Sequence, residues 1–173
     1  GDPNPTVRIG VADVRSGEVV WLDTGIQEDH YIPRIYWTSR PNTLAVVTLN
    51  RPQNHVQLFC FDGTTGEREL VFEERSDTWL DVYDFFAGIE DFFFFPEGLE
   101  EFHWISDRDG HQHIYRYDYD GNLLNQVTSG PWNVIRVEAV DLIIIVVKGK
   151  GRVIGGGGNS QYAGILQALR GAI

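Results

Sequence analysis

The chain has 173 residues, of which 42% are hydrophobic and 13% aromatic, a composition typical of a globular protein rather than a disordered one. Its formal net charge of −11 argues against nucleic acid as a partner, because phosphate binding needs a basic surface. The apolar run at residues 142–147 is too short to cross a bilayer, so we expect no membrane segment.

The first part of the chain consists of short apolar or alternating stretches that end in turn residues, which is the pattern of β-strands. Glycine and asparagine in the turns tolerate the positive φ that tight hairpins require. We therefore expect strands at residues 7–14, 19–22, 34–38, 44–49, 55–61 and 69–72.

The strand pattern weakens between Ser76 and Pro96. The acidic and aromatic residues 77–84 predict a long connection between strands, and the apolar run 92–95 predicts an inner strand or a packed segment. Further strands are expected at residues 101–105, 111–117 and 123–127, separated by polar turns that contain glycine.

Many short strands with closely spaced turns fit a sandwich, a barrel or a propeller, and an internal repeat favours the propeller. Three hairpins share a strand that ends near an aspartate, then a polar turn with glycine: Asp13 to Gly17, Asp62 to Gly66, and Asp118 to Gly121. Their glycines are 49 and 55 residues apart, and a blade takes roughly 40 to 50 residues. The sequence thus predicts an all-β fold, a partial β-propeller of about three four-stranded antiparallel blades.

The end of the chain differs in composition from the rest. Residues 142–173 contain no acidic side chain and four basic ones, so this segment carries +4 and the preceding residues carry −15. A buried strand at 140–147, a glycine-rich loop at 149–158 and a short helix capped by Asn159 or Ser160 are expected here. We therefore divide the chain into partial propeller blades, residues 1–141, and a glycine-rich basic tail of uncertain origin, residues 142–173.

Two motifs in this tail are similar to those of functional sites. Gly158 and Ser160 resemble the nucleophile elbow G-x-S-x-G, but Tyr162 stands in place of the last glycine and no aspartate or histidine follows. The same loop lacks the sequence of a phosphate-binding P-loop. A loop that caps a helix is the favoured interpretation, and we expect no catalytic residue in the chain.

The histidines and the single cysteine also have structural interpretations. His111 and His113 lie two apart on an expected strand and could hold a metal together with Asp109, but packing on the sheet is favoured. His103 is interpreted as part of the strand alternation, and Cys60 as a small buried hydrophobe. We expect no metal and no other cofactor.

Five motifs, in this order, resemble the propeller family at the N-terminus of dipeptidyl peptidase IV. They are Asn4-Pro5-Thr6-Val7 and residues 31–38, 49–54, 104–115 and 128–134, and the resemblance covers residues 2–141. In that family a propeller covers an α/β-hydrolase domain with a Ser-Asp-His triad, and in most members paired glutamates upstream of the Asn-Pro-Thr-Val motif grip the substrate's free N-terminus. The hydrolase domain and the paired glutamates lie outside these residues.

The resemblance implies that this chain is the non-catalytic propeller portion of a serine exopeptidase that releases N-terminal dipeptides. Its role would be to shield the active site and to gate substrates. The alternative is a free-standing interaction module without peptidase activity. The family also favours a periplasmic or extracellular location, with a cytoplasmic one left open.

One connection carries the candidate substrate contacts. In the resembled family, the segment after the tryptophan equivalent to Trp79 reaches toward the substrate channel, so Trp79, Asp81, Tyr83 and Asp84 are expected to line its rim. An aromatic and acidic rim would attract the ammonium group of a peptide N-terminus. The alternative is a solvated loop with a buried tryptophan.

The expected partners follow from the same resemblance and from the incomplete ring. Within the parent enzyme, this chain would contact a peptide substrate and the hydrolase domain. Three open blades would expose two large apolar faces, so we expect the chain to self-associate, with two or more copies completing a ring.

Overall fold

The computed structural model describes residues 7–25, 30–80, 92–140 and 145–150 of the chain. The strands in these ranges are β1 (Ile9–Ala12), β2 (Val19–Leu22), β3 (His30–Trp37), β4 (Thr43–Asn50), β5 (His55–Asp62), β6 (Arg68–Arg75), β7 (Phe93–Phe94), β8 (Glu101–Ser106), β9 (His113–Asp118), β10 (Leu123–Gln126), β11 (Asn133–Val140) and β12 (Ile145–Lys150). None of the described residues forms a helix that is long and apolar enough to span a membrane.

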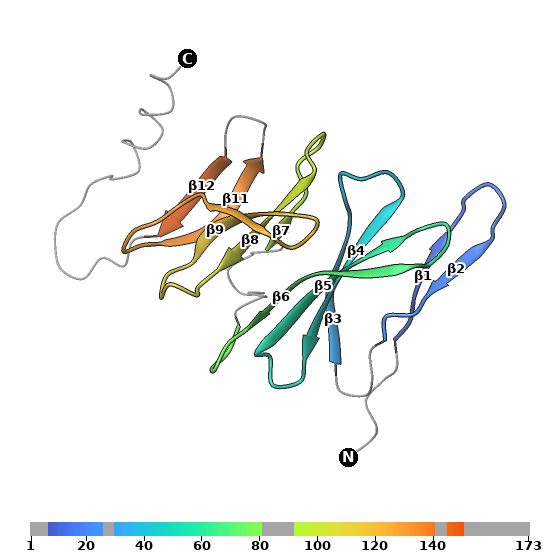
Figure 1. The fold of residues 1–173 in the computed structure, drawn as a ribbon, viewed down its shortest axis with the longest axis horizontal. Coiled ribbons are helices and arrows are strands. Elements are labelled where there is room, and N and C mark those ends of the chain that lie inside the picture. Colours follow the sequence, from blue (N-terminus) through green and yellow to red (C-terminus); the bar gives the residue numbers. More distant parts are fainter. Residues whose placement is uncertain (1–6, 26–29, 81–91, 141–144, 151–173) are drawn as a thin grey trace.

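The strands form two complete sheets and two hairpins (Figure 1). Strands β3 to β6 and strands β7 to β10 each make a four-stranded antiparallel sheet in which chain neighbours pair. The hairpins β1-β2 and β11-β12 lie at opposite ends of the molecule. Two blades and two half-blades confirm the predicted partial propeller of about three blades.

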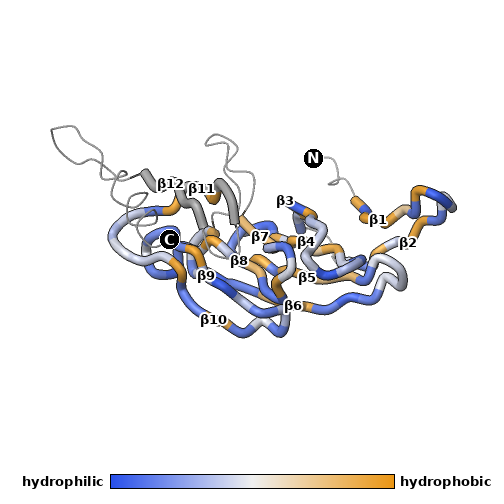
Figure 2. Tube along the Cα trace, turned by 90° about the horizontal axis from the view of Figure 1, so that it is seen from above, coloured by the Kyte–Doolittle hydropathy of each residue, from blue (hydrophilic) through white to orange (hydrophobic). Residues whose placement is uncertain are grey.

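The sheet β3 to β6 is buried on both faces because apolar residues occupy alternate positions on both sides of its central strands. On one face Leu44, Val46 and Phe61 pack with Leu22, and with Ile9, Val11 and Val20, from the hairpin β1-β2. The other face contributes a second apolar set to the core shared with the sheet β7 to β10: Ala45, Val47, Leu49, Val56, Leu58 and Cys60. The trace of β5 is correspondingly hydrophobic, whereas the hairpin turns are hydrophilic (Figure 2).

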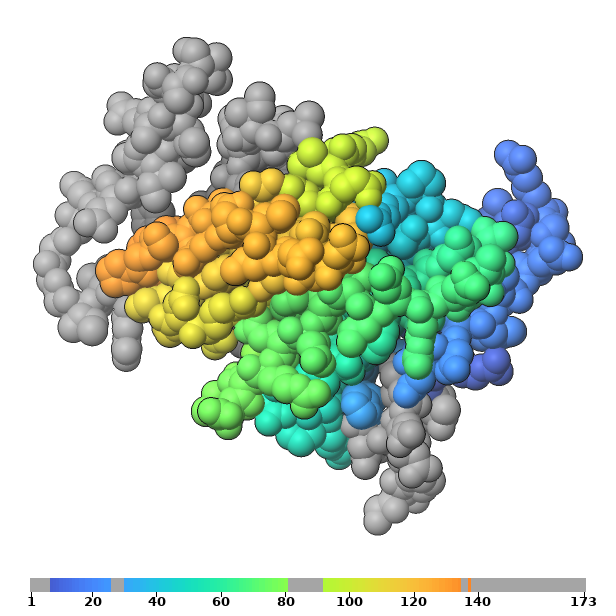
Figure 3. All heavy atoms as spheres, in the orientation of Figure 1, coloured from blue at the N-terminus to red at the C-terminus, as the bar shows by residue number. Residues whose placement is uncertain are grey.

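Phe72 on β6 is the centre of the contact between the two complete sheets. Its ring lies 4.8 Å from that of Tyr117 and 5.9 Å from that of Phe102, measured between centroids. Phe93 and Trp104 lie at 6.0 Å from the same ring. Atoms of β6 therefore lie directly against those of β9 and β10 (Figure 3), and the sheets stack face to face as propeller blades do.

The predicted repeat corresponds to one turn structure used three times. Asp13, Asp62 and Asp118 each accept backbone N–H groups on Oδ1, from Arg15 and Ser16, Thr64 and Thr65, and Asp120 and Asn122 respectively. These hydrogen bonds hold the pKa of all three carboxyl groups below its usual value, with the side chain of Asn122 the largest cause at Asp118. The glycines Gly17, Gly66 and Gly121 have φ of 74°, 77° and 81°, which explains their residue type.

Some strand bounds differ from the predicted ones. β3 begins at His30 rather than at residue 34, because a register shift between Tyr31 and Arg34 accommodates Pro33, which has no N–H to give to the ladder. The segment expected as one strand at 140–147 is divided between β11 and β12. The predicted capped helix lies outside the described residues, and the boundary at 141/142 remains a prediction.

We predict that Gly121→Ala destabilises the fold more than Gly98→Ala does. Both glycines have positive φ, 81° and 75°, so both variants carry a backbone cost of about 1 to 2 kcal/mol. Only at Gly121 would a Cβ also collide with another sheet, at the carbonyl oxygen of Val71, whereas nothing lies near a Cβ at Gly98.

Urea unfolding measures the two costs, and we expect the cost at Gly121 to be at least about twice the cost at Gly98. Equal costs would mean that β6 does not approach the β9-β10 turn.

Candidate functional site

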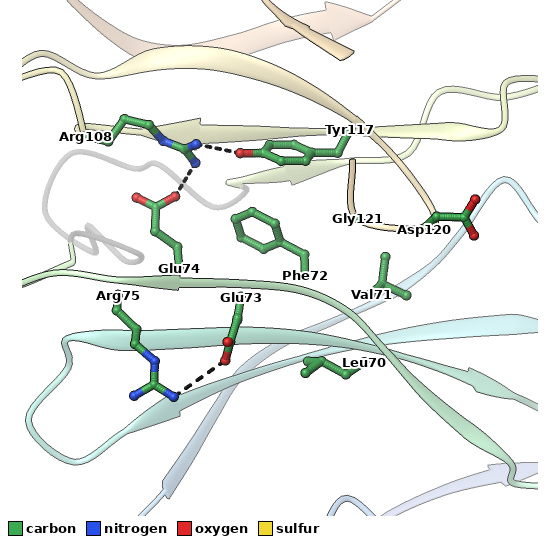
Figure 4. A pocket seen from close by; sticks show the side chains of 10 residues that line it. All are labelled: Leu70, Val71, Phe72, Glu73, Glu74, Arg75, Arg108, Tyr117, Asp120 and Gly121. Atoms are coloured by element: carbon green, nitrogen blue, oxygen red, sulfur yellow. Dashed lines mark hydrogen bonds and ion pairs between the residues drawn. The ribbon is translucent and has the colours of Figure 1, made fainter. Parts of the chain in front are cut away.

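A groove of about 570 Å³ opens between β6 and the β9-β10 hairpin, where the two complete sheets meet (Figure 4). Its volume falls within the range of small-molecule sites, roughly 300 to 1,000 Å³. Three apolar residues followed by three charged ones form its β6 wall: Leu70, Val71, Phe72, Glu73, Glu74 and Arg75. The opposite wall consists of Arg108, Tyr117, Asp120 and Gly121.

The carboxylate of Glu74 joins the two sheets at this groove. The indole Nε1–H of Trp104 donates to Glu74 Oε2 at 2.7 Å, and the hydroxyl of Ser106 donates to Oε1 at 2.6 Å. The guanidinium of Arg108 forms an ion pair with the same carboxylate. The side chain of Glu74 is only 10% exposed, so donors from the neighbouring sheet compensate this partly buried negative charge.

Arg108 is held in place by the groups around it. Its Nη1 donates to the hydroxyl of Tyr117 at 2.6 Å, its Nε donates to Ser106 Oγ at 3.0 Å, and its guanidinium lies 4.4 Å from the ring centroid of Tyr115. Burial opposes the charge, but Glu74 and Tyr117 outweigh that effect and raise the pKa of Arg108. Burial, opposed by Arg108, raises the pKa of Tyr117. The guanidinium therefore stays charged and fixed.

The groove is lined by apolar side chains and by charged ones, of which Glu74 pairs with Arg108 and Glu73 lies near Arg75. No serine, cysteine or histidine is among its lining residues, so the lining provides neither an ordinary nucleophile nor an imidazole base. Glu73 points away from Glu74 (Figure 4), pairs with His55 at 2.8 Å and lies 3.6 Å from the Arg75 guanidinium. That the chain holds no catalytic residue stays a prediction.

The structure describes one of the four predicted rim residues. Trp79 follows β6 and is 60% exposed, so it is not the buried tryptophan of the alternative interpretation; Trp104 is the one that is buried. The next residue, Leu80, is buried and donates its N–H to the carbonyl of Gln53 at 2.8 Å, which fixes the backbone beside Trp79. Asp81, Tyr83 and Asp84 lie outside the described residues, so the rim remains a prediction.

The metal alternative receives no support from the positions of its three residues. His113 is buried, with Thr128 Oγ1 3.2 Å from its Nδ1 and the carbonyl of Gly130 3.0 Å from its Nε2. Asp109 accepts a hydrogen bond from the hydroxyl of Tyr115. His111 lies before β9 and contacts Asn133. Within the described ranges no three His, Cys, Asp or Glu side chains are grouped as metal ligands would be.

Cys60 is buried, as expected from its place in an apolar strand. Burial raises the pKa of its thiol to about 12, so the thiolate that would react is scarce at neutral pH. Ser160, with the glycine-rich loop around it, lies outside the described residues.

A buried polar cluster that the sequence analysis did not predict lies on the other face of β8 and β9. Arg116 donates to Glu101 through Nε at 3.0 Å, and His103 Nε2 lies 3.1 Å from Glu101 Oε1. The Arg116 hydrogen bond is the main cause of the lowered pKa of Glu101, and burial is the main cause of the lowered pKa of His103. In the sequence, Glu101 and His103 are polar residues at alternate positions of an otherwise apolar strand. The same pattern is typical of a strand with one exposed face, so it does not predict a buried cluster.

Comparisons with known proteins agree on one family. Residues 1–147 match the family model described as the dipeptidyl peptidase IV (DPP IV) N-terminal region. The chain is 31% identical over 153 residues to the inactive dipeptidyl peptidase 10 of Mus musculus, covering 82% of this chain and 18% of that protein. It is 27% identical over 142 residues to the probable dipeptidyl peptidase 4 of Trichophyton verrucosum, covering 80% and 18%.

Solved structures give the same result. The crystal structure of Porphyromonas gingivalis dipeptidyl peptidase 4 superposes with a TM-score of 0.67 at 30% identity, covering 83% of this chain and 20% of that one. A putative dipeptidyl aminopeptidase IV from Bacteroides ovatus shares the fold, with a TM-score of 0.60 at 22% identity over 75% of this chain and 20% of that one. The chain thus spans about a fifth of the length of the relatives it matches.

We predict that Glu74→Gln lowers the free energy of unfolding by about 2 kcal/mol, because it leaves the Arg108 guanidinium without its counter-charge at a partly buried position. The matched control is Glu100→Gln, which removes an ion pair with Arg40 whose carboxylate is 72% exposed and should cost less than about 1 kcal/mol. Urea denaturation measures both. If both variants lowered the free energy of unfolding by a similar, small amount, Glu74 would not hold the two sheets together.

A second prediction concerns pH. Because burial depresses the pKa of His103 below its usual 6.5, the unfolded chain takes up a proton that the folded chain excludes, and stability falls as pH drops below about 6.5. His103→Gln should therefore flatten the loss of stability between about pH 7 and pH 5. His30→Gln, at an exposed histidine, should leave that loss unchanged. If the free energy of unfolding fell with pH equally in the wild type and in His103→Gln, His103 would not be the source of the pH dependence.

Proposed function

The chain belongs to the dipeptidyl peptidase IV N-terminal region family, and on that premise we propose that it is the non-catalytic propeller portion of a dipeptidyl peptidase IV-like serine exopeptidase. The parent enzyme would release N-terminal dipeptides. These blades would shield its active site from bulk solvent and control which peptides reach it. The catalytic triad would be supplied by a hydrolase domain outside these residues.

The observation that carries the proposal is the face-to-face stack of two four-stranded sheets in a chain of this family. The stack is held by an aromatic core around Phe72 and by Glu74, whose donors come from the other sheet. Such a stack provides a rigid wall rather than reacting groups. The lining of its groove, without serine, cysteine or histidine, supports the same role.

The gating part of the proposal rests on Trp79, Asp81, Tyr83 and Asp84. The indole of Trp79 is 60% exposed while its neighbour Leu80 is anchored in the core, so the ring is available to a ligand without being loosely attached. Peptides that are substrates of an aminopeptidase carry a positive N-terminal ammonium. An exposed indole and neighbouring carboxylates attract such a cation.

A free-standing interaction module is the second candidate. A relative with 31% identity is an inactive dipeptidyl peptidase, so propeller sequences of this family also occur in a protein without that activity. In this case the blades would act as a binding platform with no role in peptide cleavage.

The purified chain tests the proposal with a chromogenic X-Pro peptide. We expect no release of product, because the described groove holds no nucleophile with a base. Turnover that is abolished by Ser160→Ala would overturn the non-catalytic assignment.

The rim is tested with the same chain and a pair of peptides that differ only in acetylation of the N-terminus. We expect the peptide with the free amine to bind about 3- to 10-fold more tightly, a cation–π and carboxylate contribution of about 1 kcal/mol. Trp79→Ala should abolish the difference, whereas Trp21→Ala, at an indole of similar exposure on β2 (56%), should preserve it. Equal binding of both peptides to the wild-type chain would exclude an ammonium-binding rim.

A further inference from the structure

Both complete sheets hold the chain in the same way where it continues beyond their last strand. After β6, Leu80 donates its N–H to the carbonyl of Gln53, in the turn between β4 and β5, at 2.8 Å. After β10, Val134 donates its N–H to the carbonyl of Gln112, in the turn between β8 and β9, also at 2.8 Å. Leu80 and Val134 are both buried. The turn between the second and third strands therefore anchors the following connection in each sheet.

A tryptophan lies beside each anchor, and the two have different surroundings. Trp132, two residues before Val134, is partly buried and packs edge-to-face against His113, with 5.2 Å between the ring centroids. Trp79, directly before Leu80, is 60% exposed. The same backbone anchor thus accompanies a packed indole in one sheet and, in the other, an indole that a ligand can reach.

The side chain of Asn50 holds the turn that anchors Leu80. Its Oδ1 accepts the backbone N–H groups of Asn54 and His55, both at 3.0 Å, and its Nδ2 donates to Asn54 Oδ1 at 2.8 Å. The carbonyl of Asn50 accepts the N–H of Gln53 at 2.9 Å. Gln53 has a φ of 58°, which residues other than glycine seldom adopt. Asn50 therefore stabilises the backbone conformation in which the Gln53 carbonyl meets the N–H of Leu80.

The same turn holds the segment before Leu80 at a second point. Ser76 donates its N–H to the carbonyl of Asn54 at 2.9 Å, next to the acceptor of the Leu80 hydrogen bond, Gln53. Both acceptors belong to the turn that the Asn50 side chain organises. Two hydrogen bonds to one fixed turn restrict the backbone between them, which includes Trp79.

We propose that Asn50 is a positioning residue for recognition of a peptide's ammonium group at Trp79. Asn50 fixes the β4-β5 turn, the turn fixes residues 76 and 80, and these place the indole. Asn50 itself would not touch the peptide. The inference rests on the proposed role of Trp79 in gating, and such support matters because a contact group displaced by about 1 Å loses much of its effect.

Three variants separate positioning from stability alone. Asn50→Ala removes both the acceptor and the donor of this side chain. Asn50→Asp keeps the acceptor for the two backbone N–H groups, so it should restore the turn. Asn133→Ala is the matched control, because Asn133 Oδ1 accepts the N–H of Gln112 at 3.0 Å and so supports the equivalent turn of the other sheet, beside the packed Trp132.

Fluorine NMR of the purified chain labelled with 5-fluorotryptophan reports the surroundings of Trp79 without any peptide. The chain has five tryptophans, and the resonance of Trp79 is the one absent from Trp79→Phe. We expect Asn50→Ala to shift or broaden this resonance, and Asn50→Asp and Asn133→Ala to leave it at its wild-type position. An unchanged Trp79 resonance in folded Asn50→Ala would overturn the proposal.

If circular dichroism shows that Asn50→Ala does not fold, Asn54→Ala takes its place. This variant removes only the side-chain acceptor of the hydrogen bond from Asn50 Nδ2. It should shift the Trp79 resonance in a folded chain, because the turn loses part of its support. No shift in Asn54→Ala would overturn the proposal in the same way.

The two peptides that differ in acetylation of the N-terminus then test the link to recognition. We expect Asn50→Ala to reduce the preference for the free amine from about 3- to 10-fold to less than about 2-fold, and Asn50→Asp and Asn133→Ala to retain it. A preference that Asn50→Ala retains would overturn this inference and leave the proposed rim intact. Equal binding of both peptides to the wild type would overturn the rim itself, and this inference with it.

Discussion

The arrangement of the two complete sheets depends on the interactions of one partly buried carboxylate, that of Glu74. It projects from β6 beside Phe72 and receives the indole of Trp104, the hydroxyl of Ser106 and the guanidinium of Arg108. A charge in this position needs hydrogen-bond partners. Leaving one of its oxygens without a donor costs more free energy than a typical hydrogen bond contributes to stability. Aromatic packing around Phe72 brings the sheets together, and Glu74 fixes how they lie.

The stack also determines what the chain can do. Blades that are buried on both faces present only edges, turns and the grooves between them to a ligand. In the described groove Glu74 pairs with Arg108, and Glu73 lies 3.6 Å from the guanidinium of Arg75. A two-stranded hairpin, β1-β2 or β11-β12, lies at each end of the described stack.

Much of this fold could be predicted from sequence because its signals are local. The turns at Asp13, Asp62 and Asp118 are recognisable since the aspartate and glycine act within a few residues of each other. Glu74 could not be identified among its acidic neighbours, because its partners Trp104 and Arg108 are about thirty residues away. The burial of His103 and the exposure of Trp79 could not be predicted from the sequence either, because both depend on which face of a sheet another element covers.

The central claim is that β3 to β6 and β7 to β10 form one cooperative unit joined at Glu74. Native-state hydrogen exchange of the backbone amides tests it most directly. Amides of β5 and β8 should exchange through the same opening, with the same free energy, and Glu74→Gln should lower both values together. If the amides of β8 exchanged through a separate opening of lower free energy that Glu74→Gln left unchanged, the two sheets would be independent and the account would be wrong.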